Sequence, residues 1–149
     1  MTGSRPIPND VDVVIEVPRG SFVKRSRDGA IEFISPLPCP FNYGAVPTLT
    51  GGDQDHLDAL VLGPRLAVGT LVTARVQAVI LFVDGGRRDD KLICAARPLG
   101  VGERIGITVF FCCFALGKWV LNHWRGQLGR TAYRGWGDAA AVLAAAERG

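Results

Sequence analysis

Short apolar runs alternate with turn residues over the first two thirds of the chain. Residues 11–18, VDVVIEVP, are rich in β-branched side chains and stop at a proline, which predicts a strand. Further strands are predicted over 57–63 (LDALVLG), over 70–83 as one long strand or two, and over 91–96 (KLICAA). Asp-Gly pairs in SRDGAIEFI and DGGRRDD indicate tight turns. About five strands at this spacing predict a small barrel or sandwich.

The last third of the chain has a different pattern. Residues 103–121, ERIGITVFFCCFALGKWVL, fit either a helix or a strand, because their aromatic and β-branched side chains weigh against the helix. Over 136–149, WGDAAAVLAAAERG, Asp138 is expected to cap a helix that Gly149 ends. The predicted fold class is α+β, dominated by an antiparallel barrel with helix at the C-terminal end.

Length and composition are those of an ordinary globular domain. With 149 residues, the chain is expected to form one domain over 1–149. Its start, MTGSRPIPND, has no apolar leader, and its strongly apolar uncharged run, 105–117, is shorter than the roughly 20 residues that cross a bilayer. We therefore expect a cytoplasmic protein with no membrane partner.

The cysteines and the net charge suggest little chemistry by themselves. The four cysteines, Cys39, Cys94, Cys112 and Cys113, form no CxxC pair and are expected to be reduced, buried thiols. The formal net charge of +3 suits anionic ligands but does not predict a nucleic-acid binder.

Residues 53–58, DQDHLD, crowd three carboxylates between the turn-like TLTGG and the apolar run ALVL. Unpaired and half-buried, they would repel one another and cost several kcal/mol to desolvate. Either this is a solvated acidic loop, or a bend gathers Asp53, Asp55 and Asp58 as oxygen ligands for a hard cation such as Mg²⁺. An EF-hand is excluded, because its sixth position must be glycine and is Asp58.

Other charged residues mark the same chemistry. Glu16, Asp84 and Asp89 lie within or at the edges of predicted strands, Lys24 follows the first strand, and Lys91 begins another. Carboxylates that hold metals, with lysines beside them, are typical of a phosphoryl-transfer site, where metals and ammonium groups neutralise phosphate oxygens.

These motifs resemble the soluble family I inorganic pyrophosphatases. The family signature, Asp-x-Asp-x-x-Asp followed by small or apolar residues, is present as DQDHLDALV. The resemblance runs from VVIEVP through FNYG to DGGRRDDK, and more weakly to GKW and the C-terminal GW. It implies a five-stranded OB-like antiparallel β-barrel, Mg²⁺-dependent hydrolysis of pyrophosphate by direct attack of water, and a homo-oligomer.

The resemblance also implies a role for each matched residue. Asp55 would be the general base or a hydrogen-bond partner of the attacking water, and Asp58 would bridge two metals. His56, where the family commonly has Pro or Glu, is expected to face solvent, the alternative being an extra proton carrier. The implied metal ligands are Asp53, Asp58, Asp84, Asp89 and Glu16, and the implied phosphate contacts are Lys24, Tyr43 and Lys91. Mg²⁺ is the expected cofactor, with Mn²⁺ or Zn²⁺ as substitutes, because an all-oxygen shell fits several metals.

The chain departs from the family pattern where the leaving phosphate is held. The family's Tyr-Lys pair appears as Phe114–Ala115, its clamping arginine falls at or near Ser35, and a tyrosine is replaced by Cys39. Two repairs are open. Nearby arginines take over, namely Arg25, Arg27, Arg87 or Arg88, or the leaving group is an organic moiety in a more apolar pocket.

Four functions remain to be compared. A basic group facing the metals from the Phe114 side favours pyrophosphate as substrate, whereas an apolar wall favours an organic phosphate or diphosphate. A third hypothesis is a catalytically idle metal-binding module. Interleaved Trp, Tyr and Arg over 119–136 suggest nucleic-acid binding on an OB-like barrel, but the acidic cluster argues against it. Trp119 and Trp136 are expected in the core.

Overall fold

The computed structural model describes residues 10–21, 23–25, 31–34, 40–50, 56–124, 126 and 131–148. In chain order its elements are β1 (Asp10–Val17), β2 (Val23–Arg25), β3 (Ile31–Ile34), β4 (Asn42–Thr50), β5 (His56–Val61), β6 (Leu71–Asp84), β7 (Arg87–Arg88), β8 (Lys91–Cys94), α1 (Val101–Trp124), β9 (Ala132–Gly137), α2 (Ala139–Ala145) and β10 (Glu147–Arg148).

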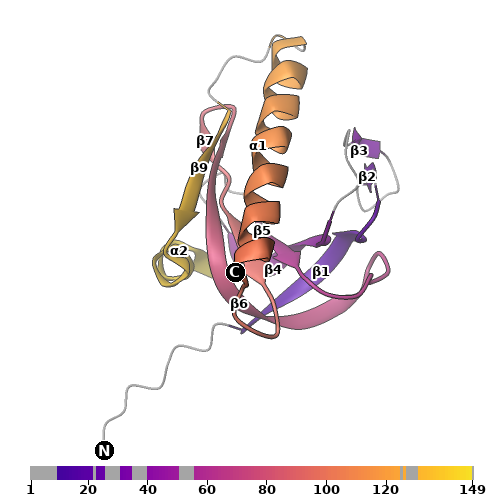
Figure 1. Ribbon diagram of the computed structural model, residues 1–149, viewed down its shortest axis with the longest axis vertical. Helices are drawn as coiled ribbons and strands as arrows, with labels where there is room; N and C mark the ends of the chain where they lie inside the picture. The colour runs from indigo at the N-terminus through magenta and orange to yellow at the C-terminus, as the bar shows by residue number, and fades with distance from the viewer. Residues whose placement is uncertain are drawn as a thin grey trace, which may run out of the picture.

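Within the described part of the chain, five strands close into a ring (Figure 1). β1 pairs with β4 and β6, β4 pairs with β5, β5 with β8, and β8 with β6. The α+β class and the barrel-like ring of five strands are confirmed. The β5–β8 pairing is parallel, while the other four are antiparallel.

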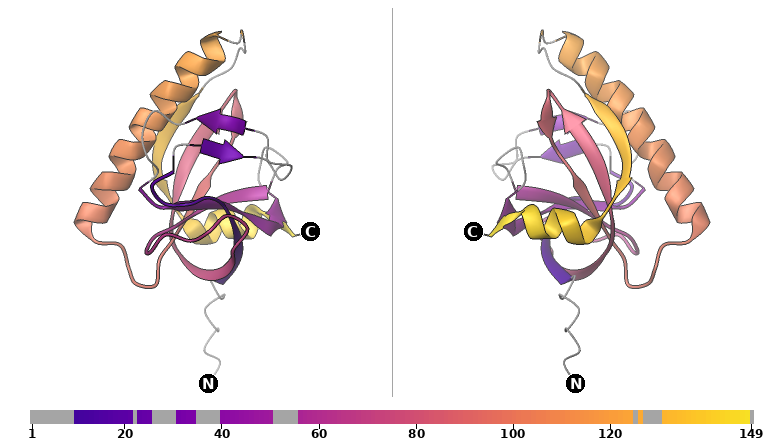
Figure 2. Two further views of the ribbon diagram at one scale, coloured as in Figure 1. Left: turned by 90° about the vertical axis from the view of Figure 1, so that its right-hand side faces the viewer. Right: turned by 90° about the vertical axis from the view of Figure 1, so that its left-hand side faces the viewer.

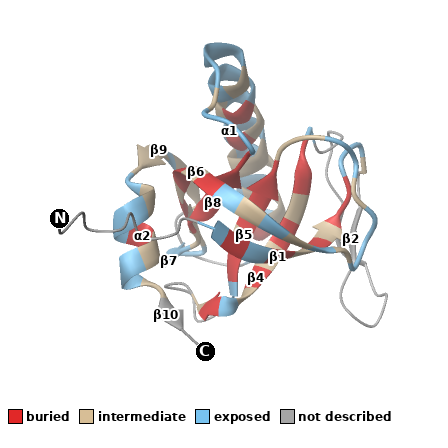
Figure 3. Cartoon of the chain, turned by 90° about the horizontal axis from the view of Figure 1, so that it is seen from below, coloured by how far each residue is buried: buried red, intermediate tan, exposed pale blue. Residues whose placement is uncertain are grey.

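Four of the five ring strands, β1, β5, β6 and β8, form where period-2 alternation or a short apolar run predicts them, whereas no strand was predicted over β4. Along β1, every second side chain from Val11 to Val17 is buried, so one face of this strand points into the ring. β8 is buried along its whole length, because it lies between two neighbours and is covered on both faces. Figure 3 shows the buried residues gathered on the ring strands.

The ambiguous segment after β8 is a helix, α1, which lies along one side of the barrel (Figures 1 and 2). Its inner face carries Ile107 and Phe111, and the Phe111 ring centroid lies 6.3 Å from that of Phe41 and 6.1 Å from that of Phe82. The expectation that Trp119 is a core residue is wrong, since it is 53% exposed. Trp136, which was also expected in the core, is half-buried and donates a hydrogen bond from Nε1 to the Thr108 hydroxyl.

By length and composition alone, α1 would be able to cross a membrane. The uncharged run 105–117 underestimates the length of this helix. α1 extends beyond that run at both ends and includes Glu103, Arg104 and Lys118. A core helix of a soluble protein passes the same test, and one face of α1 packs on the barrel.

The C-terminal helix α2 begins as expected but ends early. The Asp138 carboxylate accepts a hydrogen bond from the Ala140 backbone N–H at 3.0 Å, which confirms the N-cap. Gly149 does not end the helix: α2 stops at Ala145, because Glu147 and Arg148 pair with β4 as a short strand.

Gly44, in the FNYG stretch, allows β4 to lie tightly against β1. A Cβ at this position would lie 2.2 Å from the Val14 carbonyl oxygen and 2.8 Å from a Val13 methyl group. Since that oxygen belongs to the backbone of a paired strand, any side chain would push the two strands apart. The glycine therefore helps to place its neighbour Tyr43 in the barrel.

The cysteines follow the expectation only in part. Cys94 is buried in β8, Cys112 and Cys113 are exposed on α1, and Cys39 lies outside the described residues. The expectation of buried thiols is therefore wrong for the adjacent pair. The reason is that α1 turns this part of the apolar segment toward solvent.

Burial, together with the nearby carboxylate of Asp10, raises the pKa of the Cys94 thiol to about 12. We therefore expect Cys94 to resist alkylation by iodoacetamide at pH 8 in the native protein and to react once urea unfolds the chain. Mass spectrometry of the tryptic peptides measures both states. Equal labelling in the two states would contradict the packing of β8.

Candidate functional site

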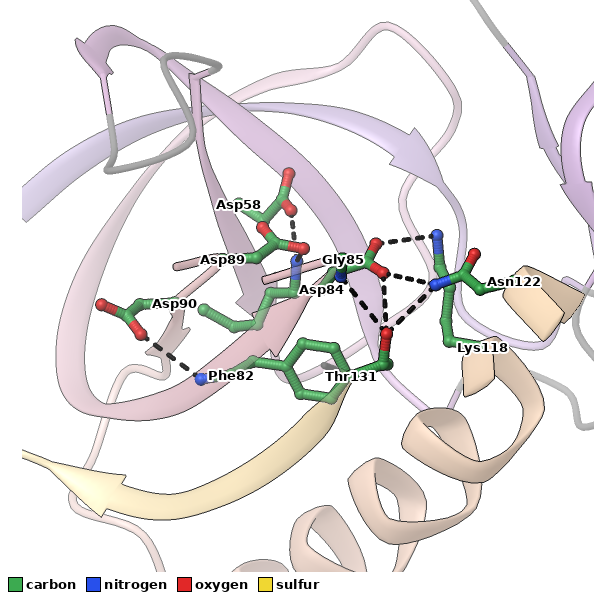
Figure 4. A network of polar contacts seen from close by, with 10 residues as sticks. Asp58, Phe82, Asp84, Gly85, Asp89, Asp90, Lys118, Asn122 and Thr131 are labelled. Carbon is green, nitrogen blue, oxygen red and sulfur yellow. Dashed lines mark hydrogen bonds and ion pairs between the residues drawn. The ribbon is translucent and has the colours of Figure 1, made fainter. Parts of the chain in front are cut away.

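The parallel pairing of β5 with β8 places Asp58 directly beside Lys91. The Lys91 ammonium lies 2.5 Å from Asp58 Oδ2 and 2.7 Å from Asp89 Oδ2. The two carboxylate oxygens therefore lie within twice a hydrogen-bond length of each other, and both contact the same ammonium group. Figure 4 shows Asp58 and Asp89 close together. The two motifs lie about 30 residues apart in the sequence. They meet because β8 pairs with β5 on one side and with β6 on the other.

Lys91 is 1% exposed, which is unusual for a lysine. Its ammonium lies 5.7 Å from the Tyr43 ring centroid and 5.9 Å from that of Phe82, so aromatic faces surround the part that carboxylates do not. Burial alone lowers the pKa of Lys91, but Asp58 and Asp89 outweigh it and raise the pKa above its ordinary value. Lys91 is therefore charged at neutral pH.

Tyr43 lies inside the same acidic environment. Its pKa is raised well above the ordinary value, first by burial and then by the charges of Asp58, Asp89 and Glu16. Its hydroxyl also hydrogen-bonds Asp58. The phenol is thus a neutral donor among three carboxylates, a group that can donate a hydrogen bond to a phosphate oxygen as well as to Asp58.

A second polar network begins at Asp84, at the end of β6. One Asp84 oxygen accepts a hydrogen bond from the Asn122 amide at 3.0 Å, and the other lies 3.3 Å from the Lys118 ammonium. The Thr131 hydroxyl contacts both Asn122 and Asp84 (Figure 4). Burial raises the pKa of Asp84, but Lys118 and Asn122 more than offset it, so the pKa lies below its usual value.

Lys118 gives the wall beside Phe114 a positive charge. Its ammonium lies 5.9 Å from the Phe114 ring centroid, and both residues belong to α1. The positive charge of Lys91 also acts on Asp84, so the two networks adjoin. This wall is therefore not wholly apolar.

The two arginines of β7 were candidates to replace the missing phosphate clamp. Both Arg87 and Arg88 are exposed, and Arg88 pairs with Asp90 at 2.7 Å. Asp90 in turn accepts from the Phe82 backbone N–H, so it holds the β6–β8 turn. The side chains of the other two candidate arginines, Arg25 and Arg27, lie outside the described residues, as does Ser35.

The structure brings together five of the expected site residues: Glu16, Tyr43, Asp58, Asp89 and Lys91. Asp84 lies in the adjoining network. Asp53, Asp55 and the side chain of Lys24 lie outside the described residues. His56, in the signature, is exposed as expected.

The carboxylates around Lys91 are candidate ligands for a divalent cation. Asp58 and Asp89 already converge on one positive charge, the Lys91 ammonium, and their donors are all carboxylate oxygens, the type that Mg²⁺ prefers. In the described part of the chain, no three His, Cys, Asp or Glu residues are grouped to hold a metal. The expected third ligand, Asp53, lies outside the described residues. The described carboxylates are of the type that such a cation binds.

The comparison with protein families agrees with this site. The model of the family described as inorganic pyrophosphatase matches residues 13–100, which include Glu16, Tyr43, Asp58, Asp89 and Lys91. The chain belongs to the inorganic pyrophosphatase family. A relative from Neisseria meningitidis, an inorganic pyrophosphatase, is 33% identical over 150 residues, which cover 89% of this chain and 85% of the relative.

Solved pyrophosphatase structures share the fold. The Thermus thermophilus inorganic pyrophosphatase has a TM-score of 0.72 at 29% identity and covers 97% of this chain and 91% of its own. The Neisseria gonorrhoeae inorganic pyrophosphatase has a TM-score of 0.69 at 28% identity, with 95% and 89% covered.

Sequence similarity is concentrated in the barrel. An inorganic pyrophosphatase from Gluconobacter oxydans is 38% identical over 98 residues, 60% of this chain and 57% of the relative. The chain thus spans a little over half the length of several curated pyrophosphatases that it matches. The family model matches residues 13–100, so the part of this chain beyond that match includes α1, which carries the Lys118 that sequence reasoning missed.

Proposed function

We propose that this protein hydrolyses inorganic pyrophosphate to two phosphates, with residues 1–149 serving as one catalytic domain. The observation that carries the proposal is the Lys118–Asp84 ion pair beside Phe114. It supplies a cation on the side where the family's phosphate clamp is substituted. A basic wall favours an anionic leaving group over an organic one, because an ammonium group attracts a phosphate oxygen and gains nothing from an apolar moiety.

The proposed cofactor is Mg²⁺, with Mn²⁺ or Zn²⁺ as substitutes. Asp53, Asp58 and Asp89 would hold it, with Asp84 and Glu16 at a neighbouring position. When bound, a divalent cation supplies positive charge to the phosphate oxygens and acidifies the attacking water.

The other steps of the reaction are assigned to side chains of the protein. Asp55 is proposed to accept the proton of the attacking water. The phosphate under attack is proposed to accept hydrogen bonds from Lys91, Tyr43 and Lys24. These donors would orient it for in-line displacement. Lys118 is proposed to turn from Asp84 to the leaving phosphate, whose negative charge grows as the bond breaks.

The proposal is tested by measuring phosphate release from pyrophosphate with Mg²⁺, beside a panel of phosphomonoesters and organic diphosphates. Mg²⁺-dependent release with pyrophosphate as the preferred substrate is expected. Turnover of one organic phosphate without turnover of pyrophosphate would favour the organic substrate instead. The names of plant and algal relatives, soluble inorganic pyrophosphatases, support a soluble enzyme, which we place in the cytoplasm.

Removing the charge of Lys118 should weaken the use of pyrophosphate. We expect Lys118→Ala to lower kcat/KM about 10- to 100-fold, since a hydrogen bond to a charged group contributes about 1.5–3 kcal/mol. Lys118→Arg should retain most of the activity. Arg134→Ala, which removes an exposed cation of β9, is the control. An active Lys118→Ala enzyme would mean that another residue holds the leaving phosphate.

A further inference from the structure

The inner face of α1 becomes polar at its C-terminal end. Ile107, Phe111 and Phe114 pack on the barrel, and steps of four residues then bring Lys118 and Asn122 to the same side of the helix. Asn122 is buried, with 8% of its surface exposed. A buried amide needs hydrogen-bond partners, because leaving water without them costs free energy. Those partners lie at the end of β6.

The Asn122 amide joins two residues that belong to different parts of the chain. Its nitrogen donates to Asp84 Oδ1 at 3.0 Å and to the Thr131 hydroxyl at 3.1 Å (Figure 4). The same hydroxyl accepts a hydrogen bond from the Gly85 backbone N–H at 3.3 Å. Since a hydroxyl oxygen has two acceptor positions and both are taken, its hydrogen is directed to the third neighbour, Asp84 Oδ1, at 3.4 Å. Asp84, Asn122 and Thr131 thus form a closed triangle of hydrogen bonds.

Both neutral donors of this triangle are held by the fold. Thr131 directly precedes β9, whose pairing with the end of β6 brings it across from Asp84. Asn122 belongs to the last turn of α1 and has a short side chain. Lys118, by contrast, reaches Asp84 with a flexible four-carbon stem. The triangle is therefore the fixed part of this network, and the ammonium is the part that moves most easily.

The two oxygens of Asp84 differ in the charge of their partners. Oδ1 accepts from Asn122 and Thr131, which are neutral, whereas Oδ2 lies 3.3 Å from the Lys118 ammonium. The side chains of Asp84 and Lys118 are each 26% exposed, so water only partly replaces a lost partner. When Lys118 turns away, the neutral donors still satisfy one oxygen and hold the orientation of the carboxylate. Without them, the ion pair would be the main support of Asp84, and breaking it would cost more.

We propose that Asn122, together with Thr131, is a positioning residue that lets Lys118 leave Asp84 during the reaction. The two neutral donors keep the carboxylate in place and stabilise its charge, so the ammonium can pass from Asp84 to the leaving phosphate at low cost. The inference rests on the proposed function, in which Lys118 makes that movement. It adds a residue that acts through Lys118 and not on the substrate.

The first test is a double-mutant cycle on pyrophosphate hydrolysis. Asn122→Leu keeps the branched shape of the side chain but removes both hydrogen bonds, so Asp84 should retain Lys118 more strongly. We expect kcat/KM to fall about tenfold, mainly through kcat, because the leaving phosphate gains charge as its bond breaks. In a Lys118→Ala background, the same substitution should cost less than about twofold, since no ammonium remains to be released.

Two further variants accompany this cycle. Thr131→Val removes the second neutral donor while keeping the size of the side chain, so it should lower kcat/KM in the same direction even if Asn122→Leu does not fold. Gln77→Leu is the matched control. This half-buried amide near the middle of β6 donates to the Ala95 carbonyl at 2.9 Å. Its loss removes a comparable hydrogen bond away from Asp84 and should leave kcat/KM unchanged.

The second test follows Lys118 without turnover. The chain has three lysines, Lys24, Lys91 and Lys118, so labelling lysine with ¹³C at Cε gives three side-chain NMR signals, and Lys118→Arg identifies one of them. The probe is Mg²⁺ with methylenediphosphonate, whose P–C–P link is not cleaved by water. Its addition should shift the Lys118 signal in the wild type and in Gln77→Leu, and much less in Asn122→Leu.

The outcomes separate this inference from the proposed function. If the Lys118 signal of the wild type does not move, Lys118 stays on Asp84, and both its proposed movement and the role of Asn122 are wrong. If the signal moves equally in the wild type and in Asn122→Leu, Asn122 does not act through Lys118, and the proposed function stands without it. The same conclusion follows if the losses of Asn122→Leu and Lys118→Ala multiply, or if Asn122→Leu keeps the wild-type rate.

Discussion

Replacing Lys91 by methionine is expected to lower the free energy of unfolding by about 3–5 kcal/mol, the cost of leaving buried charge without its partner. Methionine keeps most of the apolar stem of Lys91 against Tyr43 and Phe82 but removes the ammonium between Asp58 and Asp89. Two carboxylates then face each other in a largely buried place. Urea denaturation in EDTA measures the loss.

Two further measurements separate charge from packing. Asp58→Asn combined with Lys91→Met should lose less than the sum of the single changes, because one of the two repelling charges is also gone. Since the folded-state pKa of Lys91 is raised, its contribution is fully present below about pH 10 and is lost only as pH rises toward that folded-state pKa, so the loss should not vary between pH 7 and 9. A loss below 1 kcal/mol would contradict the site as described.

Replacing Asp55 by asparagine is expected to lower the turnover of pyrophosphate about 10²- to 10⁴-fold, the usual contribution of a positioned general base. Asparagine is isosteric with aspartate but does not accept a proton at neutral pH. Folding should be unchanged, because asparagine keeps the size and shape of the aspartate side chain. Steady-state kinetics at saturating Mg²⁺ measures the effect.

A surface aspartate is the control for Asp55. Asp10 lies at the start of β1 with its side chain 49% exposed and 3.6 Å from Arg75, so Asp10→Asn should leave turnover unchanged. If Asp55→Asn keeps wild-type turnover while folding normally, Asp55 is not the base, and Asp58, Asp89 or the water itself would have to take that role.

Most of the barrel was predictable, because four of its five ring strands carry local signals, while β4 was not predicted. β1 alternates along its length, and the Asp-Gly before β7 marks a tight turn. The residues of α1 carried no such signal, since its outward face is as apolar as its inward face and periodicity could not separate helix from strand. The same feature explains why Trp119 and the cysteine pair were wrongly expected to be buried.

The site was predictable in part, for the same physical reason. Asp58, Asp89 and Lys91 are fixed by strand pairing, so the family motif placed them correctly beside one another. Lys118 contacts Asp84 only because α1 is helical and turns it, together with Asn122 four residues later, toward the end of β6. Without the helix assignment, nothing in the GKW stretch connected that lysine to the site.

The parallel pairing of β5 with β8 has a consequence for how the molecule folds. Asp58 and Lys91 are neighbours across this pair of strands. In the sequence, however, the long strand β6 and the short strand β7 lie between them and must be placed first. Such non-local pairings form slowly, because loop-closure entropy is lost before the contact is gained. The salt bridge at the centre of the site should therefore form late, and appearance of activity during refolding would report closure of the ring rather than collapse of its strands.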